Sequence, residues 1–402
     1  MKVGLFDVDG HNYPNLALMK ISAWHKAKGD EVSMIEFPTL EHYDKAYVAK
    51  VFGDEYSKMP DEYLNADGIE YGGTGFAIKV ENGKEVYHPE LDKQLPSEIE
   101  HMYPDYSLYP ELTKDTAYGF LTRGCCNNCS FCIVSKKEGM CSTKVADLSE
   151  FWRGQKKIEL LDPNLLACRD RLDLLKQLAE SKAKVNFSQG LDARFITEET
   201  AKALAKINIS TVHFAFDFMK NEKAIIKGLK TFQEHCPVNS RNATVYMLTN
   251  YDTTLEEDIY RVKMIRECGF QPDVRIYRKP TAPRSVRDLQ RWCNNRFFYR
   301  SCDLEDYVPR KDGKTFKQLY LGDNRMKALL ILFVLVYMAF LLREFVRGVK
   351  AMTYEALQAQ EMAAQLKRTQ EELNLALGFI NWQGLDSAWT AWKEGAGNDE
   401  IR

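Results

Sequence analysis

The stretch Arg123-Gly-Cys-Cys-Asn-Asn-Cys-Ser-Phe-Cys-Ile133 carries the most informative pattern in the chain. Cys125, Cys129 and Cys132 are spaced so that three thiolates converge from one short loop. Most cubane iron–sulfur clusters are held by four Cys thiolates, so a loop with three leaves one iron free for another ligand. A cubane cluster with one open iron is therefore one of the centres that this loop could hold.

Two other arrangements of thiols fit the same stretch. The spacing from Cys126 through Cys129 to Cys132 also suits zinc. The candidates for a fourth zinc ligand are Cys141, Cys168 and Cys236. A disulfide framework is the third possibility, but the first residues do not form a secretory signal, so we expect a reducing compartment. In the cluster interpretation, Cys126 is a loop thiol without a role.

The spacing Cys-x3-Cys-x2-Cys resembles the signature of the radical S-adenosylmethionine superfamily. Phe120-Leu-Thr-Arg-Gly124 before the cysteines and Ile133-Val-Ser135 after them extend the resemblance. It implies a [4Fe–4S] cluster whose open iron binds S-adenosylmethionine, with Phe131 at the cofactor, and an electron donor such as flavodoxin or ferredoxin. Reductive cleavage of the cofactor would release a 5′-deoxyadenosyl radical, so the cofactor supplies the chemistry and the protein positions it.

Length and charge restrict the remaining classes. The chain has 402 residues, enough for two domains and a tail, and a formal net charge of −2. That charge shows no electrostatic footprint of a nucleic-acid-binding protein. Ten cysteines are present and none precedes Cys125. A second cluster near the amino terminus is thereby excluded, which argues against the methylthiotransferase branch of the superfamily.

Residues 113–308 show the alternation typical of repeated β/α units. From Thr116 onward, apolar runs suited to buried parallel strands alternate with amphipathic stretches of helical length. Strands are predicted near 117–122, 157–161, 184–187, 211–216, 243–248 and 273–277, and helices at 170–181, 197–206 and 255–268. Six such units predict a partial, TIM-like (β/α)6 barrel, which is the fold that the resemblance implies. The cysteine loop then follows the first strand at the carboxyl end, where such barrels place their chemistry.

Polar residues that follow the predicted strands are candidates for cofactor contacts. They are Asp162, Asn164, Arg194, Asp217 and Asn250. In the superfamily a Gly-Gly-Glu after the second strand contacts the amino group of the methionine moiety, whereas this chain has Leu-Leu-Asp-Pro-Asn there. The alternatives are a helix cap for Asp162 or Asn164, an ion pair for Arg194 and a turn for Asn250. His213, inside a predicted strand, is interpreted as a satisfied core histidine.

Residues 1–112 predict a doubly wound, Rossmann-like domain. A strand from Val3, a helix at 16–28 and a strand at 29–35 form a βαβ unit, and strand-like runs near 45–51 and 68–71 continue it. The domain resembles the cobalamin-binding type that precedes the barrel in one branch of the superfamily.

The cobalamin resemblance depends on four residues. Asp9 and His11 match an Asp-x-His motif whose His can bind cobalt, and Gly72 and Gly73 could let a nucleotide tail approach the backbone. Pro14 replaces an expected Gly, so persistence of the fold without its ligand is the alternative. Asp-x-Asp-Gly also occurs in haloacid-dehalogenase-like phosphatases, but His11 stands where they have Thr.

The tail, 309–402, lies outside the resemblance. Residues 328–342 are wholly apolar between Lys327 and Arg343, and no polar face interrupts them. A spanning helix needs about 20 residues, so this run is short, but we favour a transmembrane helix over a core helix. A polar helix is expected at about 352–376, with fraying from Gly378. The cluster requires a reducing compartment, which places the barrel in the cytoplasm.

These observations predict a radical S-adenosylmethionine enzyme of unknown substrate. Hydrogen abstraction is the expected reaction, and methyl transfer is expected if cobalamin binds. The competing class is a non-catalytic zinc or iron–sulfur module that acts as an adaptor at a membrane.

Overall fold

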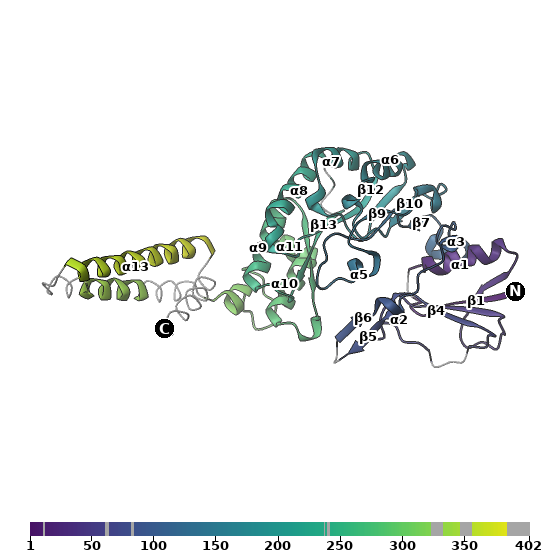
Figure 1. Ribbon diagram of the computed structural model, residues 1–402, viewed down its shortest axis with the longest axis horizontal. Coiled ribbons are helices and arrows are strands. Elements are labelled where there is room, and N and C mark those ends of the chain that lie inside the picture. Colours follow the sequence, from purple (N-terminus) through teal and green to yellow (C-terminus); the bar gives the residue numbers. More distant parts are fainter. Residues whose placement is uncertain are drawn as a thin grey trace. The chain divides into compact units, whose positions relative to one another are not determined.

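The computed structural model describes residues 1–10, 13–60, 64–81, 84–236, 238, 242–322, 333–345 and 356–383 (Figure 1). Helices and parallel strands alternate along most of this range, which confirms the predicted α/β class. The chain divides into two compact units, Met1–Arg296 and Phe297–Arg402. The first unit contains both parallel sheets and the cysteine loop.

The amino-terminal sheet has four parallel strands in the order β2-β1-β3-β4. They are β1 (Lys2–Asp7), β2 (Glu31–Met34), β3 (Lys45–Ala49) and β4 (Ile69–Gly72). Helix α1 (Leu16–Ala27) joins β1 to β2, and the Asn15 side chain caps it by accepting from the Leu18 amide at 3.3 Å. The predicted βαβ opening is therefore confirmed.

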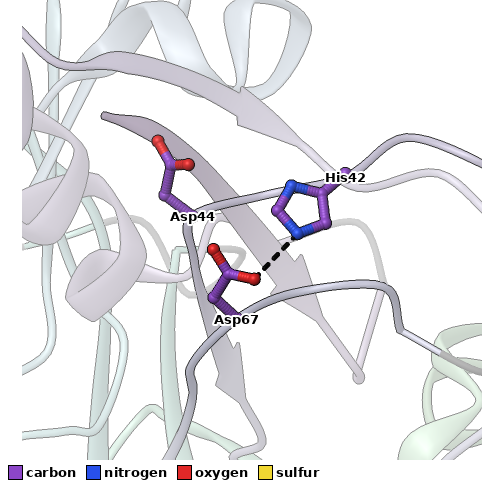
Figure 2. Close-up of side chains that lie close together, drawn as sticks. All are labelled: His42, Asp44 and Asp67. Carbon is purple, nitrogen blue, oxygen red and sulfur yellow. Dashed lines mark hydrogen bonds and ion pairs between the residues drawn. The ribbon is translucent and has the colours of Figure 1, made fainter.

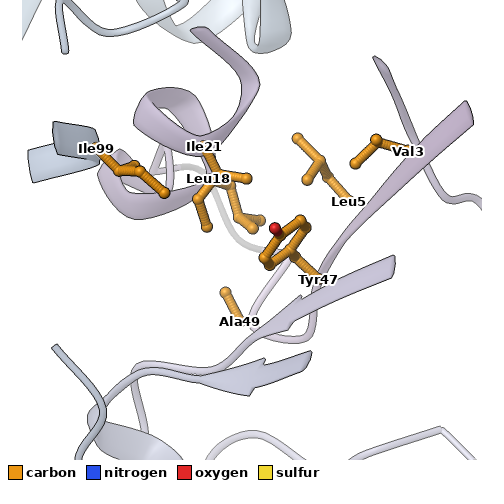
Figure 3. Close-up of a cluster of buried hydrophobic side chains, with 7 residues drawn as sticks. All are labelled: Val3, Leu5, Leu18, Ile21, Tyr47, Ala49 and Ile99. Carbon is orange, nitrogen blue, oxygen red and sulfur yellow. The ribbon is translucent and has the colours of Figure 1, made fainter. Parts of the chain in front are cut away.

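A small apolar core joins α1 to this sheet. Figure 3 shows its buried side chains, which are Val3, Leu5, Leu18, Ile21, Tyr47, Ala49 and Ile99. Short elements follow the sheet: α2 (Thr74–Ala77), β5 (Ile78–Glu81), β6 (Lys84–Tyr87), α3 (Ser97–Glu100) and α4 (Pro110–Thr113). Strands β5 and β6 form an antiparallel pair.

The second sheet has six parallel strands that neighbour one another in chain order, β7-β10-β11-β12-β13-β14. They are β7 (Thr116–Gly119), β10 (Lys157–Leu160), β11 (Lys184–Phe187), β12 (Ile209–Ala215), β13 (Ala243–Thr249) and β14 (Gln271–Ile276). The associated helices are α6 (Arg171–Ser181), α7 (Glu198–Leu204), α8 (Glu222–His235), α9 (Leu255–Glu267) and α10 (Arg284–Asn294). All six predicted strands are confirmed. Because every strand runs the same way, their carboxyl ends meet at one edge of the sheet.

The two faces of this sheet differ in chemistry because side chains alternate along each strand. The buried apolar residues include Ala117, Ile158, Leu160, Val185, Phe187, Val212, Phe214, Ala243, Val245, Met247 and Val274. Phe214 packs on Phe232 of α8, so this face contacts the helices. The alternate, partly buried positions are polar, among them Tyr118, Glu159, Asn186, Thr211, His213, Thr244, Tyr246 and Asp273.

His213 lies on the polar face rather than in the apolar core. Its Nδ1 atom is 2.5 Å from Oγ1 of Thr244, and its ring stacks on Tyr246 with centroids 4.6 Å apart. Burial lowers the pKa of the imidazole. The histidine is therefore satisfied, as the sequence indicated, but it belongs to a half-open polar surface.

The second unit begins after Arg296. It contains most of α11 (Arg296–Ser301), a π-helical turn (Lys317–Leu321), a helix at 333–345 and α13 (Ala356–Gln383). The predicted polar helix is confirmed, but it continues past Gly378 to Gln383. Within the described ranges, no helix has both the length and the apolar character needed to cross a membrane. Residues 328–332 of the predicted apolar segment lie outside the described residues, so the membrane contact stays a prediction.

Candidate functional site at the cysteine loop

The cysteine loop lies between β8 (Thr122–Arg123) and α5 (Val134–Glu138), and β9 (Thr143–Lys144) pairs antiparallel with β8. The Glu138 carboxylate accepts from the Gly124 amide at 3.2 Å, and the Cys125 amide donates to the Gly139 carbonyl at 3.1 Å. Gly124 has φ +88°, and a Cβ there would lie 2.1 Å from the Cys141 carbonyl oxygen. The start of the loop, at Gly124 and Cys125, is thus hydrogen-bonded to the end of α5, and only glycine fits at position 124.

The three predicted cluster ligands are partly buried, whereas Cys126 is exposed. Burial raises the pKa of the Cys129 thiol to about 11, and the neighbouring thiols and Asp217 add to the effect. Burial also raises the pKa of Cys132. A metal centre that binds here must displace these protons, because thiolates are the ligands.

The spread of the sulfur atoms bears on which metal the loop suits. In the described part of the chain, only His42, Asp44 and Asp67 bring three His, Cys, Asp or Glu ligand atoms within 4.8 Å of one another. The three loop sulfurs therefore do not all lie within 4.8 Å of one another. Thiolates on one tetrahedral zinc ion, each 2.3 Å from the metal, lie about 3.8 Å apart. A cubane binds each cysteine at a different iron, so its three sulfurs need not lie so close together.

The His42, Asp44 and Asp67 group is a surface arrangement before β3 and β4 (Figure 2). Its ligand atoms already have protein partners. The His42 Nε2 atom lies 3.0 Å from Oδ1 of Asp67, and Oδ2 of Asp44 accepts from the Lys2 amide at 2.6 Å. All three side chains are exposed. We assign this group to surface ion pairing and not to a metal centre.

A pocket of about 690 Å³ lies beside the cysteine loop, where the carboxyl ends of β10 to β13 meet. The loop contributes Asn127 and Cys129, and the strand ends contribute Asn164, Asp192 and Asp217. Small-molecule sites have volumes of roughly 300–1,000 Å³ and favour this edge of parallel α/β sheets. Three predicted contacts, Asn164, Arg194 and Asp217, line this pocket. The other three candidates near the loop lie elsewhere.

Asp162 is a structural acceptor behind the loop. Its carboxylate accepts from the Leu121 amide at 3.1 Å and from the Thr122 amide and hydroxyl, each at 2.6 Å. It is buried, and burial raises its pKa to about 6. Asp162 therefore ties the end of β10 to the segment that leads into the cysteines, and it does not line the pocket.

Asn164 faces the cysteines. It precedes the short 3-10 helix η4 (Leu165–Ala167), yet its side chain makes no capping hydrogen bond. Its Nδ2 atom is 3.3 Å from Oδ2 of Asp192 and 3.5 Å from Sγ of Cys125. The side chain is 2% exposed, and its Oδ1 atom has no partner among the described residues. The helix-cap alternative is excluded for Asn164, and a free buried acceptor is left in a pocket residue.

Asp192 connects the loop to two strand ends, and the sequence analysis did not identify it. Its carboxylate accepts from Arg194 Nε at 2.9 Å, Arg194 Nη2 at 2.7 Å and Asn127 Nδ2 at 2.9 Å. Burial alone would raise its pKa, but the hydrogen bonds from Arg194 and Asn127 outweigh burial and lower it. Arg194 thus forms an ion pair within the protein, which was the alternative to a cofactor contact, with a carboxylate supplied two residues earlier in the chain.

Asp217 and Asn250 follow β12 and β13. Asp217 lines the pocket, its Oδ1 atom accepts from the Leu248 amide at 2.8 Å, and burial raises its pKa. Asn250 has φ +60°, and its Nδ2 atom donates to the Tyr277 carbonyl at 2.8 Å. It does not line the pocket, so its contacts fit the turn interpretation.

Phe131 anchors the loop to the same strand ends. Its ring stacks on Phe218 with centroids 5.7 Å apart and meets the edge of Tyr251 at 5.4 Å. The Tyr251 hydroxyl donates to Oγ of Ser130 at 2.8 Å. Tyr251 was not predicted, because an aromatic residue in a turn gives no signal of what it packs against. Phe131 is placed against aromatic rings and not in the pocket wall.

Two of the four residues predicted to bind cobalamin, Asp9 and Gly73, contact the protein's own backbone. The Asp9 carboxylate accepts from the amides of Val51 at 2.6 Å and Phe52 at 3.2 Å. Gly73 has φ +99°, and a Cβ there would lie 2.4 Å from the Lys50 carbonyl oxygen. The space beside Gly73 is thus filled by the protein, although nothing lies within 4 Å of a Cβ at Gly72. His11 lies outside the described residues.

Comparisons with known proteins do not assign a family: no protein-family model matches the chain, and no curated protein matches it significantly. Function must therefore be argued from the site.

Proposed function

We propose that the chain is a radical S-adenosylmethionine enzyme in which Cys125, Cys129 and Cys132 hold a [4Fe–4S] cluster. The observation that carries this proposal is the position of the cysteine loop, which contributes Cys126 and Cys129 to the lining of a 690 Å³ pocket at the carboxyl ends of parallel strands. When bound, such a cluster supplies the electron that cleaves S-adenosylmethionine and so generates a radical able to abstract hydrogen from a substrate.

The chain's own residues position the cofactor and restrict solvent. The free Oδ1 atom of Asn164 would accept from the ammonium group of the cofactor's methionine moiety. The Asp217 carboxylate, which also lines the pocket, would be available to ribose hydroxyls. Phe131, which lies between Cys129 and Cys132 in the loop, packs on Phe218 and Tyr251 and would help to shield a bound cluster from water.

The six β/α units are proposed to form a partial barrel whose interior is the polar face of the sheet. Ala215 is exposed and belongs both to this face and to the pocket lining. The polar face therefore reaches the pocket at Ala215, and Phe214 of the helix-covered face lines the pocket as well. Cytoplasmic location and reduction by a flavodoxin or ferredoxin remain part of this proposal. Cobalamin is left out of it, because Asp9 and Gly73 are used by the backbone.

Anaerobic reconstitution with iron and sulfide tests the assignment. We expect about four irons per wild-type chain, the absorbance of a cluster and, with a reductant, release of 5′-deoxyadenosine from S-adenosylmethionine. Serine at Cys125, Cys129 or Cys132 should abolish this activity. Cys126→Ser is the control for iron content, because that thiol lies in the same loop but is exposed and is not one of the three ligands. Cys126 also lines the pocket, so this variant is compared by its iron content and not by cleavage of S-adenosylmethionine.

Two results would refute the proposal. Retention of zinc with no uptake of iron would favour the non-catalytic metal module. A fully loaded cluster that never cleaves S-adenosylmethionine would leave an iron–sulfur protein of another class.

A further inference from the structure

We infer that Asn164 donates an N–H···S hydrogen bond to Cys125 and thereby raises the reduction potential of the cluster, an inference that rests on the proposed function. The contact is direct: Nδ2 of Asn164 lies 3.5 Å from Sγ of Cys125. Asn164 is almost fully buried, so the contact is shielded from water. Its side chain is not used as a helix cap, which leaves the amide free for this role.

Asp192 fixes which end of the Asn164 amide faces the sulfur. The Asp192 carboxylate is an acceptor 3.3 Å from Nδ2, and its lowered pKa keeps it ionised. An amide flipped by 180° would place Oδ1 against that carboxylate and against the thiolate. The two hydrogens of the NH2 group can instead serve one acceptor each. The orientation with the donor toward Cys125 is therefore the stable one.

Asp192 is itself held in place, so the donor is preorganised. Arg194 donates to both of its carboxylate oxygens, and Asn127 donates from within the cysteine loop. The backbone of Cys125 is fixed by its bond to Gly139. Donor and sulfur thus belong to one connected network, and neither depends on a mobile surface side chain.

The expected consequence is a change in redox behaviour. Reduction adds negative charge to the cluster, and a donor on a ligand sulfur stabilises that charge. Removal of the donor should therefore shift the potential to a more negative value. Asn164 acts here as a positioning and tuning residue through Cys125.

The test is a redox titration of the reconstituted full-length protein, followed by electron paramagnetic resonance without S-adenosylmethionine. Asn164→Ala and Asn164→Ser should both shift the midpoint potential to more negative values, because neither side chain can bring a donor to the sulfur. Asn221→Ala is the matched control: Asn221 lines the same pocket and its side chain caps nothing. Its potential should equal that of the wild type.

The outcomes separate this inference from the proposed function. If the wild type takes up no cluster, the proposed function fails. If wild type and both Asn164 variants carry the same cluster with equal potentials, the enzyme assignment survives and the tuning role is refuted. An equal shift in Asn221→Ala would also refute it, since any change in the pocket would then have the same effect.

Discussion

Replacement of Gly228 by alanine should displace the 3-10 helix η5 (Ala193–Phe195) and with it the pocket residues Asp192 and Arg194. Gly228 lies in α8 against η5, and a Cβ at Gly228 would lie 1.8 Å from the Ala193 carbonyl oxygen. Ordinary contact begins at 3.4 Å, so the two elements must separate by about 1.6 Å. The Asp192 and Arg194 side chains flank Ala193. The 2.9 Å hydrogen bond from Asn127 to Asp192 would be broken by a displacement of that size.

The energetic cost follows from two opposing effects. Overpacking of this kind costs about 1–3 kcal/mol, whereas Gly to Ala in a helix contributes about 1 kcal/mol of stabilisation. The free energy of unfolding should therefore fall by up to about 2 kcal/mol, with a larger loss of iron uptake on reconstitution. The control is Gly378→Ala in α13, where nothing lies within 4 Å of an added Cβ and the variant should be as stable as the wild type or slightly more so.

Thermal unfolding and iron content measure the two effects separately. An unchanged unfolding midpoint together with wild-type iron uptake in Gly228→Ala would refute the reasoning. It would show that α8 moves away without displacing η5 and that the Asp192 network does not depend on their contact.

Three further changes test other parts of the site. Gly124→Ala should lose more iron uptake than Gly139→Ala. Both positions have positive φ, so alanine costs about 1–2 kcal/mol at each, but only at Gly124 would the added Cβ also clash with the backbone. Equal losses of iron uptake would contradict this. Arg261→Met should lower the free energy of unfolding by about 3–5 kcal/mol in chemical denaturation, since it leaves Asp258 buried without its ion pair; a loss under about 1 kcal/mol would contradict it. For Asp162, burial raises the folded-state pKa from 3.8 to about 6, so the folded protein binds this proton more tightly than the unfolded chain does. The resulting contribution to the free energy of unfolding is fully present below pH 3.8 and is lost as the pH rises through 6. The stability advantage of the wild type over Asp162→Asn should shrink across that window by about 3 kcal/mol, and a difference that does not vary with pH would refute the shift.

The strands of the second sheet were predictable because each is a short run of residues with its own pattern of apolar positions. Strand β13, for example, runs from Ala243 to Thr249 with strict alternation of buried and partly buried positions, a period that reads directly as a strand. The end of α13 was predicted less well. Gly378 indicated fraying, but a single glycine costs only about 1 kcal/mol in a helix, and the helix continues to Gln383.

The hydrogen-bond network of the site could not be predicted in the same way. Asp192 and Asn127 are short polar residues in loops, where turn formation explains them equally well. They meet only because the cysteine loop follows β7 while Asp192 follows β11, two strands away in the sheet. Such a contact depends on the order of strands, which residue spacing does not specify.

The pair Asp162 and Asn164 shows why the exact side chain matters at the end of β10. Asp162 faces the backbone donors of Leu121 and Thr122, where a carboxylate is the better acceptor. Asn164 faces two acceptors, the ionised Asp192 and the Cys125 sulfur, where only a donor is favourable. An acidic residue at 164 would meet like charge on both sides.

Asn164→Asp should therefore lose iron uptake, and neutralising the neighbour in Asn164→Asp/Asp192→Asn should recover part of it. The single variant Asp192→Asn is the control that reports the effect of the neighbour alone. Iron content after reconstitution is the measurement. If the double variant binds no more iron than Asn164→Asp, repulsion from Asp192 is not the reason for an amide at position 164, and Asn164 would then be required for its contact with Cys125 alone.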